Sequence, residues 1–182
     1  DKHLSDTIFS LLQNERWEQA IVLGEFAKSQ NHVFDREREK IYLVNYCIAL
    51  KAAGNDAAAA KLLIAEDWSD SAPDFKLAKA VLLGDIEESI KFMKVIGKKG
   101  ELISEHAYHT WPLFRDVRSN YLFRETYESI YGYSFVEELK REAAKTQYQI
   151  AEQGGADQTP TRSESKSEDR EKPQSESEWH TE

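Results

Sequence analysis

Two stretches thirty residues apart carry one pattern: Gly54-Asn55-Asp56-Ala57-Ala58-Ala59 and Gly84-Asp85-Ile86-Glu87-Glu88-Ser89-Ile90. In each, a glycine turn ends one apolar helix and starts another, and a small residue follows five places after the glycine. A looser third copy reads Glu15-Arg16-Trp17-Glu18-Gln19-Ala20-Ile21. Self-similarity at a period of roughly 30 to 40 residues is the sequence signature of a helical repeat array. We therefore predict an all-α solenoid of about three helical hairpins.

Small residues mark one expected helix crossing. Ala20, Gly24 and Ala27 recur at three- and four-residue spacing, so they share one face of the helix that follows the corner at Asn14 and Glu15. Because small side chains let two backbones approach closely, we expect tight packing there. Gly24 costs about 1 kcal/mol of helix propensity relative to alanine, and this packing is the expected compensation.

A longer helix is predicted from about Asp35 to Ala53. Its segment Ile41–Leu50 is apolar nearly all round, which is typical of a helix covered on both sides. We therefore place it in the middle of the array. Cys47 lies in this segment and is the only cysteine of the chain, so we expect a small buried side chain and no internal disulfide.

The 182 residues divide into three predicted parts. Residues 1–100 hold the repeats, 101–150 form a helical capping segment, and 151–182 form a disordered acidic tail rich in Ser and Glu. Further helices are predicted over Asp56–Ala65, Asp74–Leu83, a segment capped by Asp85, Leu102–Thr110, Tyr121–Tyr131 and Ser134 to about Glu152.

The net charge of −9 is unevenly distributed. Residues 151–182 carry nine acidic and four basic side chains, so the rest of the chain is nearly balanced. No basic face for duplex nucleic acid is expected, and no apolar run approaches the roughly 20 residues of a membrane span. With no visible signal peptide, we expect a cytoplasmic location. The chain begins at Asp1, which is typical of a fragment or a processed form.

The helical hairpins resemble tetratricopeptide repeats. In the second hairpin, Leu43, Tyr46, Cys47 and Leu50 precede the turn and Ala59 follows it. The spacings of 39 and 30 residues depart from the family's 34, and the first copy lacks the turn glycine. In the third copy the resemblance lies in Leu77, Ala80, Leu83 and Ser89. In the first copy it lies in Leu4, Thr7, Ile8, Leu11 and Ala20. The segment Trp111–Arg118 is similar to a closing element of repeat regions in bacterial multidomain signalling proteins.

The resemblance implies a non-catalytic scaffold that binds a protein or peptide partner. In such arrays the partner lies in a concave groove lined by the first helix of each hairpin. The residues expected to line it here are Phe9, Gln13, Asn45, Ile48, Lys51 and Ala78. The alternative is a regulatory or oligomerisation module of a larger bacterial signalling protein, favoured by Val44 and Ile48 as an apolar face for self-association.

A second candidate surface is basic. Lys91, Lys94, Lys98 and Lys99 recur at helical spacing. Lysines near a helix C-terminus are favoured by the helix dipole, which explains most of this pattern. The functional alternative is docking of an acidic partner, including the chain's own acidic tail.

The remaining patterns favour structure over chemistry. The aromatic residues between Tyr108 and Phe135 are expected to cap the last repeat, with a partner-binding patch as the alternative. His106 and His109 share one helix turn, but zinc needs three or four ligands. No nucleophile turn or phosphate-binding glycine loop is present. We therefore expect no enzyme, no metal and no cofactor.

Overall fold

The computed structural model describes residues 2–29, 35–136 and 140. These residues form helices and no strand, which confirms the all-α prediction for this part of the chain. They all belong to one unit, Asp1–Ala143. The acidic tail and most of the helix predicted from Ser134 lie outside the described residues. The helices are α1 (Lys2–Gln13), α2 (Trp17–Ser29), α3 (Arg36–Ala52), α4 (Asp56–Ala65), α5 (Pro73–Leu83), α6 (Ile86–Ile96), α7 (Glu105–Thr110), η1 (Pro112–Phe114), η2 (Val117–Ser119) and α8 (Tyr121–Tyr131).

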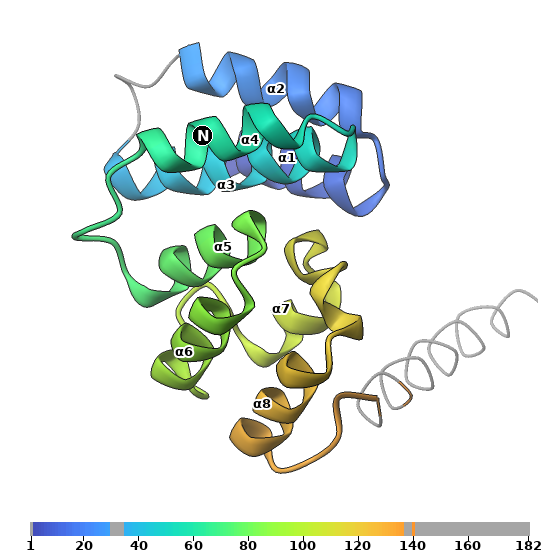
Figure 1. The fold of residues 1–182 in the computed structure, drawn as a ribbon. Coiled ribbons are helices and arrows are strands. Elements are labelled where there is room, and N and C mark those ends of the chain that lie inside the picture. The colour runs from blue at the N-terminus through green and yellow to red at the C-terminus, as the bar shows by residue number, and fades with distance from the viewer. Residues whose placement is uncertain (1, 30–34, 137–139, 141–182) are drawn as a thin grey trace, which may run out of the picture. The chain divides into compact units, whose positions relative to one another are not determined.

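The first six helices pack as three consecutive hairpins. α1 contacts α2, α3 contacts α4, and α5 contacts α6 (Figure 1). Neighbouring hairpins meet through α2 against α3 and through α4 against α5. The first helices of successive hairpins also touch, α1 with α3 and α3 with α5.

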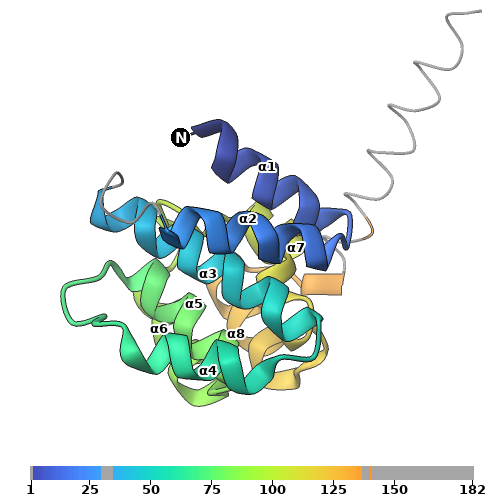
Figure 2. The same ribbon diagram turned by 90° about the horizontal axis from the view of Figure 1, so that it is seen from above.

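α3 is the central helix, as its apolar sequence predicts. It contacts α1, α2, α4, α5 and η1, and Figure 2 shows it among its neighbouring helices. Most of its second half is buried. Asp35 caps its first turn by accepting a hydrogen bond of 2.8 Å from the Arg38 backbone N–H. The helix therefore begins one residue later than predicted, because the capping residue itself is not helical.

The contact between α2 and α3 depends on the small residues of α2. Ala20, Gly24 and Ala27 are all buried. The space beside Gly24 is filled by Tyr46, since a Cβ built on Gly24 meets Tyr46 Cδ2 at 2.5 Å and Tyr46 Cβ at 2.9 Å. The predicted close approach of these helices is confirmed, and it involves an aromatic ring lying on the glycine.

The hairpin turns use left-handed backbone conformations. Gly54 has a φ of 81° and Gly84 a φ of 75°, values that glycine adopts at little cost. The first turn has no glycine, and Glu15 adopts a φ of 55° in its place. A side chain with a Cβ pays roughly 1–2 kcal/mol for this conformation.

We expect Glu15→Gly to raise the free energy of unfolding by about 1 kcal/mol, because glycine relieves this strain. The change also removes an exposed ion pair of 3.7 Å with Arg115, which is worth less than about 1 kcal/mol. The measurement is urea denaturation followed by tryptophan fluorescence. Glu15→Ala is the control, because it removes the carboxylate and keeps the Cβ. Equal stabilities of the two variants would contradict backbone strain at this turn.

The capping segment follows α6 and contains an aromatic core. Tyr108, Phe114, Phe123 and Tyr127 have no exposed surface, and Phe135 is 1 % exposed. These side chains confirm the structural interpretation of the aromatic cluster. Tyr121 is the exception at 72 % exposed, because it begins α8 and points away from this core.

The entry to the capping segment is fixed by a buried carboxylate. Asp74, in the first turn of α5, is 6 % exposed and accepts hydrogen bonds from the backbone N–H groups of Leu102 (3.0 Å) and Ile103 (2.8 Å). The helix predicted from Leu102 therefore begins later, at Glu105, where Ser104 provides the cap.

Candidate functional site

The face expected to form the concave groove is covered by the capping segment. η1 packs against α3 and α5, and its residues Leu113 and Phe114 are buried. Arg115, which follows η1, contacts the first hairpin. Its guanidinium lies 5.1 Å from the centre of the Trp17 ring and 3.7 Å from the Glu15 carboxylate. The segment that follows α7 therefore occupies the place where the family resemblance puts a partner.

The predicted groove residues do not form one accessible surface. Asn45, Ile48 and Ala78 are 2 %, 5 % and 1 % exposed, so they offer no accessible surface in the described unit, and their contact with a partner stays a prediction. Helical spacing placed them on first helices but gave no information on what packs over that face. Val44 is also buried, so Val44 and Ile48 form no exposed apolar face in the described unit, and self-association through them stays a prediction.

The other predicted groove residues are separated from one another. Phe9 is half-buried and Gln13 is exposed on α1. Lys51 is half-buried and forms an ion pair of 3.1 Å with Asp56. Together with Ile48 it borders a cavity of about 160 Å³ that Pro112 and Leu113 close.

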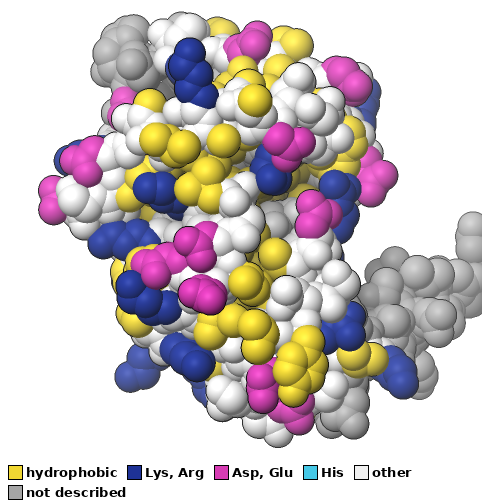
Figure 3. Space-filling view, viewed as in Figure 1, with side chains coloured by type: hydrophobic (Ala, Val, Ile, Leu, Met, Phe, Trp, Pro, Cys, Tyr) yellow, Lys and Arg dark blue, Asp and Glu magenta, His cyan; other side chains and the backbone are white. Residues whose placement is uncertain are grey.

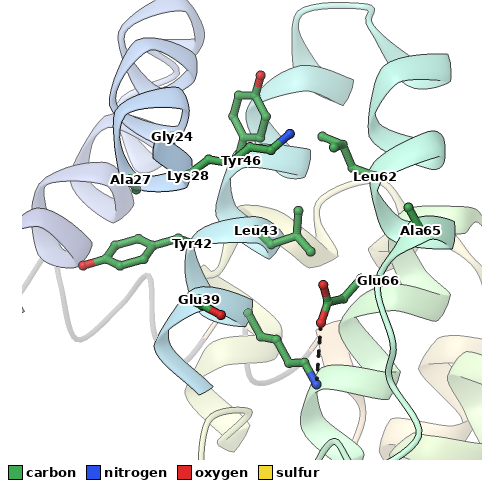
Figure 4. A pocket seen from close by; sticks show the side chains of 11 residues that line it. Gly24, Ala27, Lys28, Glu39, Tyr42, Leu43, Tyr46, Leu62, Ala65 and Glu66 are labelled. Carbon is green, nitrogen blue, oxygen red and sulfur yellow. Dashed lines mark ion pairs between the residues drawn. The ribbon is translucent and has the colours of Figure 1, made fainter. Parts of the chain in front are cut away.

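A different groove lies between α2 and α4, with α3 as its floor; we call it the α2–α4 groove (Figure 4). Its volume is about 320 Å³. Side chains from three helices line it, and in Figure 4 the two walls stand apart with the α3 side chains between them. The lining residues are Gly24, Ala27, Lys28, Glu39, Lys40, Tyr42, Leu43, Tyr46, Leu62, Ala65 and Glu66.

Residue size explains why this groove is open. Ala27 on the α2 wall and Ala65 on the α4 wall have little side-chain volume, whereas the space beside Gly24 is filled by Tyr46. Leu43 on the floor and Leu62 on the α4 wall are only half-buried. The space-filling view shows hydrophobic side chains gathered over α3 and α4 among charged ones (Figure 3). The groove thus offers apolar contact area that the described residues do not cover.

One end of the groove is bordered by an ion pair between buried Lys40 and half-buried Glu66. Lys40 is 4 % exposed, donates to Ser71 Oγ and lies 4.0 Å from the Glu66 carboxylate. Its ammonium group also stands 5.6 Å from the centre of the Trp68 ring. These contacts compensate its charge locally, so Lys40 is a structural residue of this end of the groove.

The tyrosines of the floor are neutral at physiological pH. Burial, followed by the neighbouring Glu25 carboxylate, raises the pKa of Tyr46, whose hydroxyl donates to Glu25 Oε1 at 3.2 Å. Burial likewise raises the pKa of Tyr42. The two tyrosine rings of the floor are therefore uncharged, and the charged α3 residues Glu39 and Lys40 lie at one end of the groove.

Lys28 is the one cation lining the groove that has no hydrogen-bond acceptor or ion-pair partner among the described residues. It is exposed near the end of α2. In Figure 4 its side chain extends from α2 over α3 in the direction of Leu62. The groove therefore combines an apolar floor with an unpaired positive charge.

Cys47 is a packed core residue, as the sequence predicts. It has no exposed surface, and burial raises its pKa to about 12. Because the thiolate is the reactive form, the folded protein holds this thiol in its unreactive state at pH 8.

We expect Cys47 to react with a thiol reagent such as dithionitrobenzoate at pH 8 only after unfolding. The measurement compares the native chain with the chain in denaturing urea, where the pKa returns to its ordinary value near 8.5. Rapid labelling of the native chain would contradict the buried position.

The lysines of the predicted basic surface are exposed, as docking of an acidic partner requires. Lys91, Lys94, Lys98 and Lys99 are all at the surface. Lys91 is paired with Glu88 at 2.9 Å, and Lys98 lies 6.0 Å from the centre of the Tyr131 ring. Two of the four lysines thus have structural partners, which favours the structural interpretation. The acidic tail lies outside the described residues.

The histidine pair is divided between surface and core. His106 is exposed, whereas His109 is buried, lies 2.8 Å from the Tyr127 hydroxyl and stacks on Phe135. Tyr127 in turn donates to Glu105.

The described residues include no group of three or more side chains able to hold a metal ion. None of the described helices combines the length and apolar character that a membrane crossing needs.

Comparison of the chain with protein-family models, with curated protein sequences and with solved structures finds no match. The geometry of the α2–α4 groove is therefore the basis for the functional proposal. The resemblance to tetratricopeptide repeats stays a prediction.

Sequence reasoning missed this groove. Its floor residues Tyr42 and Leu43 and its wall residue Leu62 carry no motif. The available signal was the pair of small residues Gly24 and Ala27, which we interpreted only as a helix contact. Near the end of that contact, the small side chain of Ala27 leaves part of the space between α2 and α4 unfilled.

Proposed function

We propose that the chain is a non-catalytic protein- or peptide-binding scaffold of tetratricopeptide type, and that its partner binds in the α2–α4 groove. The order of the hairpins supports this type of array, since each first helix contacts the next first helix. η1 packs against the first helices α3 and α5, on the face where the resemblance predicts a concave groove. A partner of the described unit is therefore expected on the other side of α3.

The observation that carries the proposal is the uncovered apolar floor of the groove. Ligand sites are concave and mostly apolar, with a small number of polar groups at defined positions. The groove of about 320 Å³ has this composition: half-buried Leu43 and Leu62, neutral tyrosines and charges at the edges. Its volume is at the lower end of the roughly 300–1,000 Å³ range of ligand pockets, which suits one or two side chains of a peptide.

We expect Ala65→Trp to abolish binding of peptides selected from a random display library on the full chain. Ala65 is exposed and lines the groove, so an indole there fills the groove without disturbing the core. The control is Ile64→Trp, since Ile64 is 69 % exposed on the same helix and does not line the groove. Binding is measured by fluorescence polarisation. Equal binding by the two variants would refute the groove as the site.

The second candidate function is self-association, and exposed apolar side chains on α2 support it. Val22 and Phe26 are 64 % and 54 % exposed on this helix. Their exposure leaves an apolar surface that a second copy is able to cover. A sedimentation coefficient that rises with protein concentration would support this candidate, and a constant one would remove it.

A further inference from the structure

We propose that the α2–α4 groove selects a peptide segment in which an acidic residue stands close to an apolar anchor, with the acidic side chain paired to Lys28. This inference rests on the proposed function, because it names the chemistry of the partner for the same groove. It follows from three properties of the groove: an apolar floor, one unpaired cation, and a fixed arrangement of the other charges.

The floor requires an apolar anchor. Leu43 and Leu62 are half-buried, and the α2 wall opposite Leu62 offers Gly24 and Ala27, which carry no polar side chain. A leucine, phenylalanine or tryptophan side chain gains apolar burial there at about 25 cal/mol per Å². The groove is too small for a whole helix, so the anchor is one or two side chains.

Lys28 supplies the charge selection. It lines the groove, and no described carboxylate pairs with it. Its side chain extends over the floor in Figure 4, so its ammonium group is directed to the space that an anchor would occupy. A carboxylate next to the anchor pairs with this cation, whereas a lysine or arginine there is repelled.

The other charges at the groove do not neutralise Lys28. Glu66 is paired with Lys40 at 4.0 Å, and Glu25 accepts the hydrogen bond of Tyr46. Glu39 lines the groove beside the Lys40–Glu66 pair, and Figure 4 shows it away from Lys28. Glu39 therefore disfavours an acidic residue at that end, which leaves the Lys28 side as the place for the carboxylate.

The test is selection of a random linear peptide library on the full chain and, separately, on Lys28→Glu. We expect peptides selected on the unmodified chain to carry Asp or Glu within a few residues of a Leu, Phe or Trp, and those selected on Lys28→Glu to carry Lys or Arg instead. For one selected peptide, Lys28→Glu should weaken binding about fivefold to tenfold, as reversal of an exposed ion pair implies. The control Lys61→Glu changes the net charge equally at an exposed position outside the groove, and it should alter binding less than about twofold.

The outcomes separate the inference from the proposed function. If peptides are selected and Ala65→Trp blocks them, but Lys28→Glu and a Glu→Gln peptide bind normally, the acidic preference is wrong and the groove remains the site. If no peptide is selected, or Ala65→Trp blocks none of them, the proposed function fails and the inference fails with it. A switch from acidic to basic peptides on Lys28→Glu supports both.

Discussion

Replacing Gly24 with valine is expected to lower the free energy of unfolding by about 3 kcal/mol. A Cβ at this position meets Tyr46 Cδ2 at 2.5 Å and Tyr46 Cβ at 2.9 Å. The ring is able to rotate away, but the Cβ of Tyr46 is fixed to the α3 backbone. Relief of the clash therefore requires α2 and α3 to separate, which loosens the contact between the first two hairpins. The loss is measured by urea denaturation.

Two further variants identify the cause of this loss. Glu18→Val places the same β-branched side chain at an exposed position of α2, and it should change stability by less than about 0.5 kcal/mol. Gly24→Ala should destabilise less than valine, because alanine regains about 1 kcal/mol of helix propensity. A Gly24→Val variant as stable as the unmodified chain would show that the two helices are not in close contact.

Replacing Asp74 with alanine is expected to lower the free energy of unfolding by about 3 kcal/mol. The carboxylate is buried and accepts two backbone hydrogen bonds, from Leu102 and Ile103. Hydrogen bonds to charged groups contribute about 1.5–3 kcal/mol each, and a buried N–H left without a partner costs about 1–3 kcal/mol. The same urea titration measures the loss, and hydrogen exchange of the Ile103 amide should become faster.

The matched variants for Asp74 are Asp74→Asn and Asp70→Ala. Asparagine keeps an acceptor oxygen without the charge, so it should lose about half as much stability as alanine. Asp70 is exposed in the loop before α5, and its removal should cost less than about 0.5 kcal/mol. Unchanged Ile103 exchange in Asp74→Ala would contradict the role of this carboxylate as the anchor of the capping segment.

Local signals in the sequence were sufficient for most helix boundaries. Gly84 ends α5 in a left-handed conformation, and Asp85 caps α6 by accepting from the Glu88 backbone N–H. The bounds of α4 and α8 agree with the prediction because Gly54 precedes one helix and Gly132 ends the other. Each of these signals acts within a few residues, so it is visible in one sequence.

Contacts between distant segments were not predictable in this way. η1 covers α3 and α5, and Arg115 reaches Glu15 across one hundred residues of chain. The apolar residues Leu113 and Phe114 show that the segment is buried, but periodicity does not specify the surface that buries it. For this reason the sequence predicts a site on the face that the capping segment covers, where three of the six predicted groove residues are buried.

The α2–α4 groove was hidden for a related reason. It lies where α2 and α4 stand apart above α3, and the small side chains of Ala27 and Ala65 on its two walls leave it open. Small residues predict close packing when a partner helix is present, and they leave open space when none is. Only the positions of α2 and α4 relative to α3 distinguish these cases.

The most direct test of the binding surface is a nuclear magnetic resonance titration of the full, ¹⁵N-labelled chain with a peptide selected on it. We expect the largest shift changes at the amides of Gly24, Ala27, Leu43, Leu62 and Ala65, which line the α2–α4 groove. Amides of α5 and η1 should move little, because that face is already covered. Shifts concentrated on Ala78, Leu113 and Phe114, with the groove amides unchanged, would contradict this account and indicate that the partner binds where η1 packs on α3 and α5.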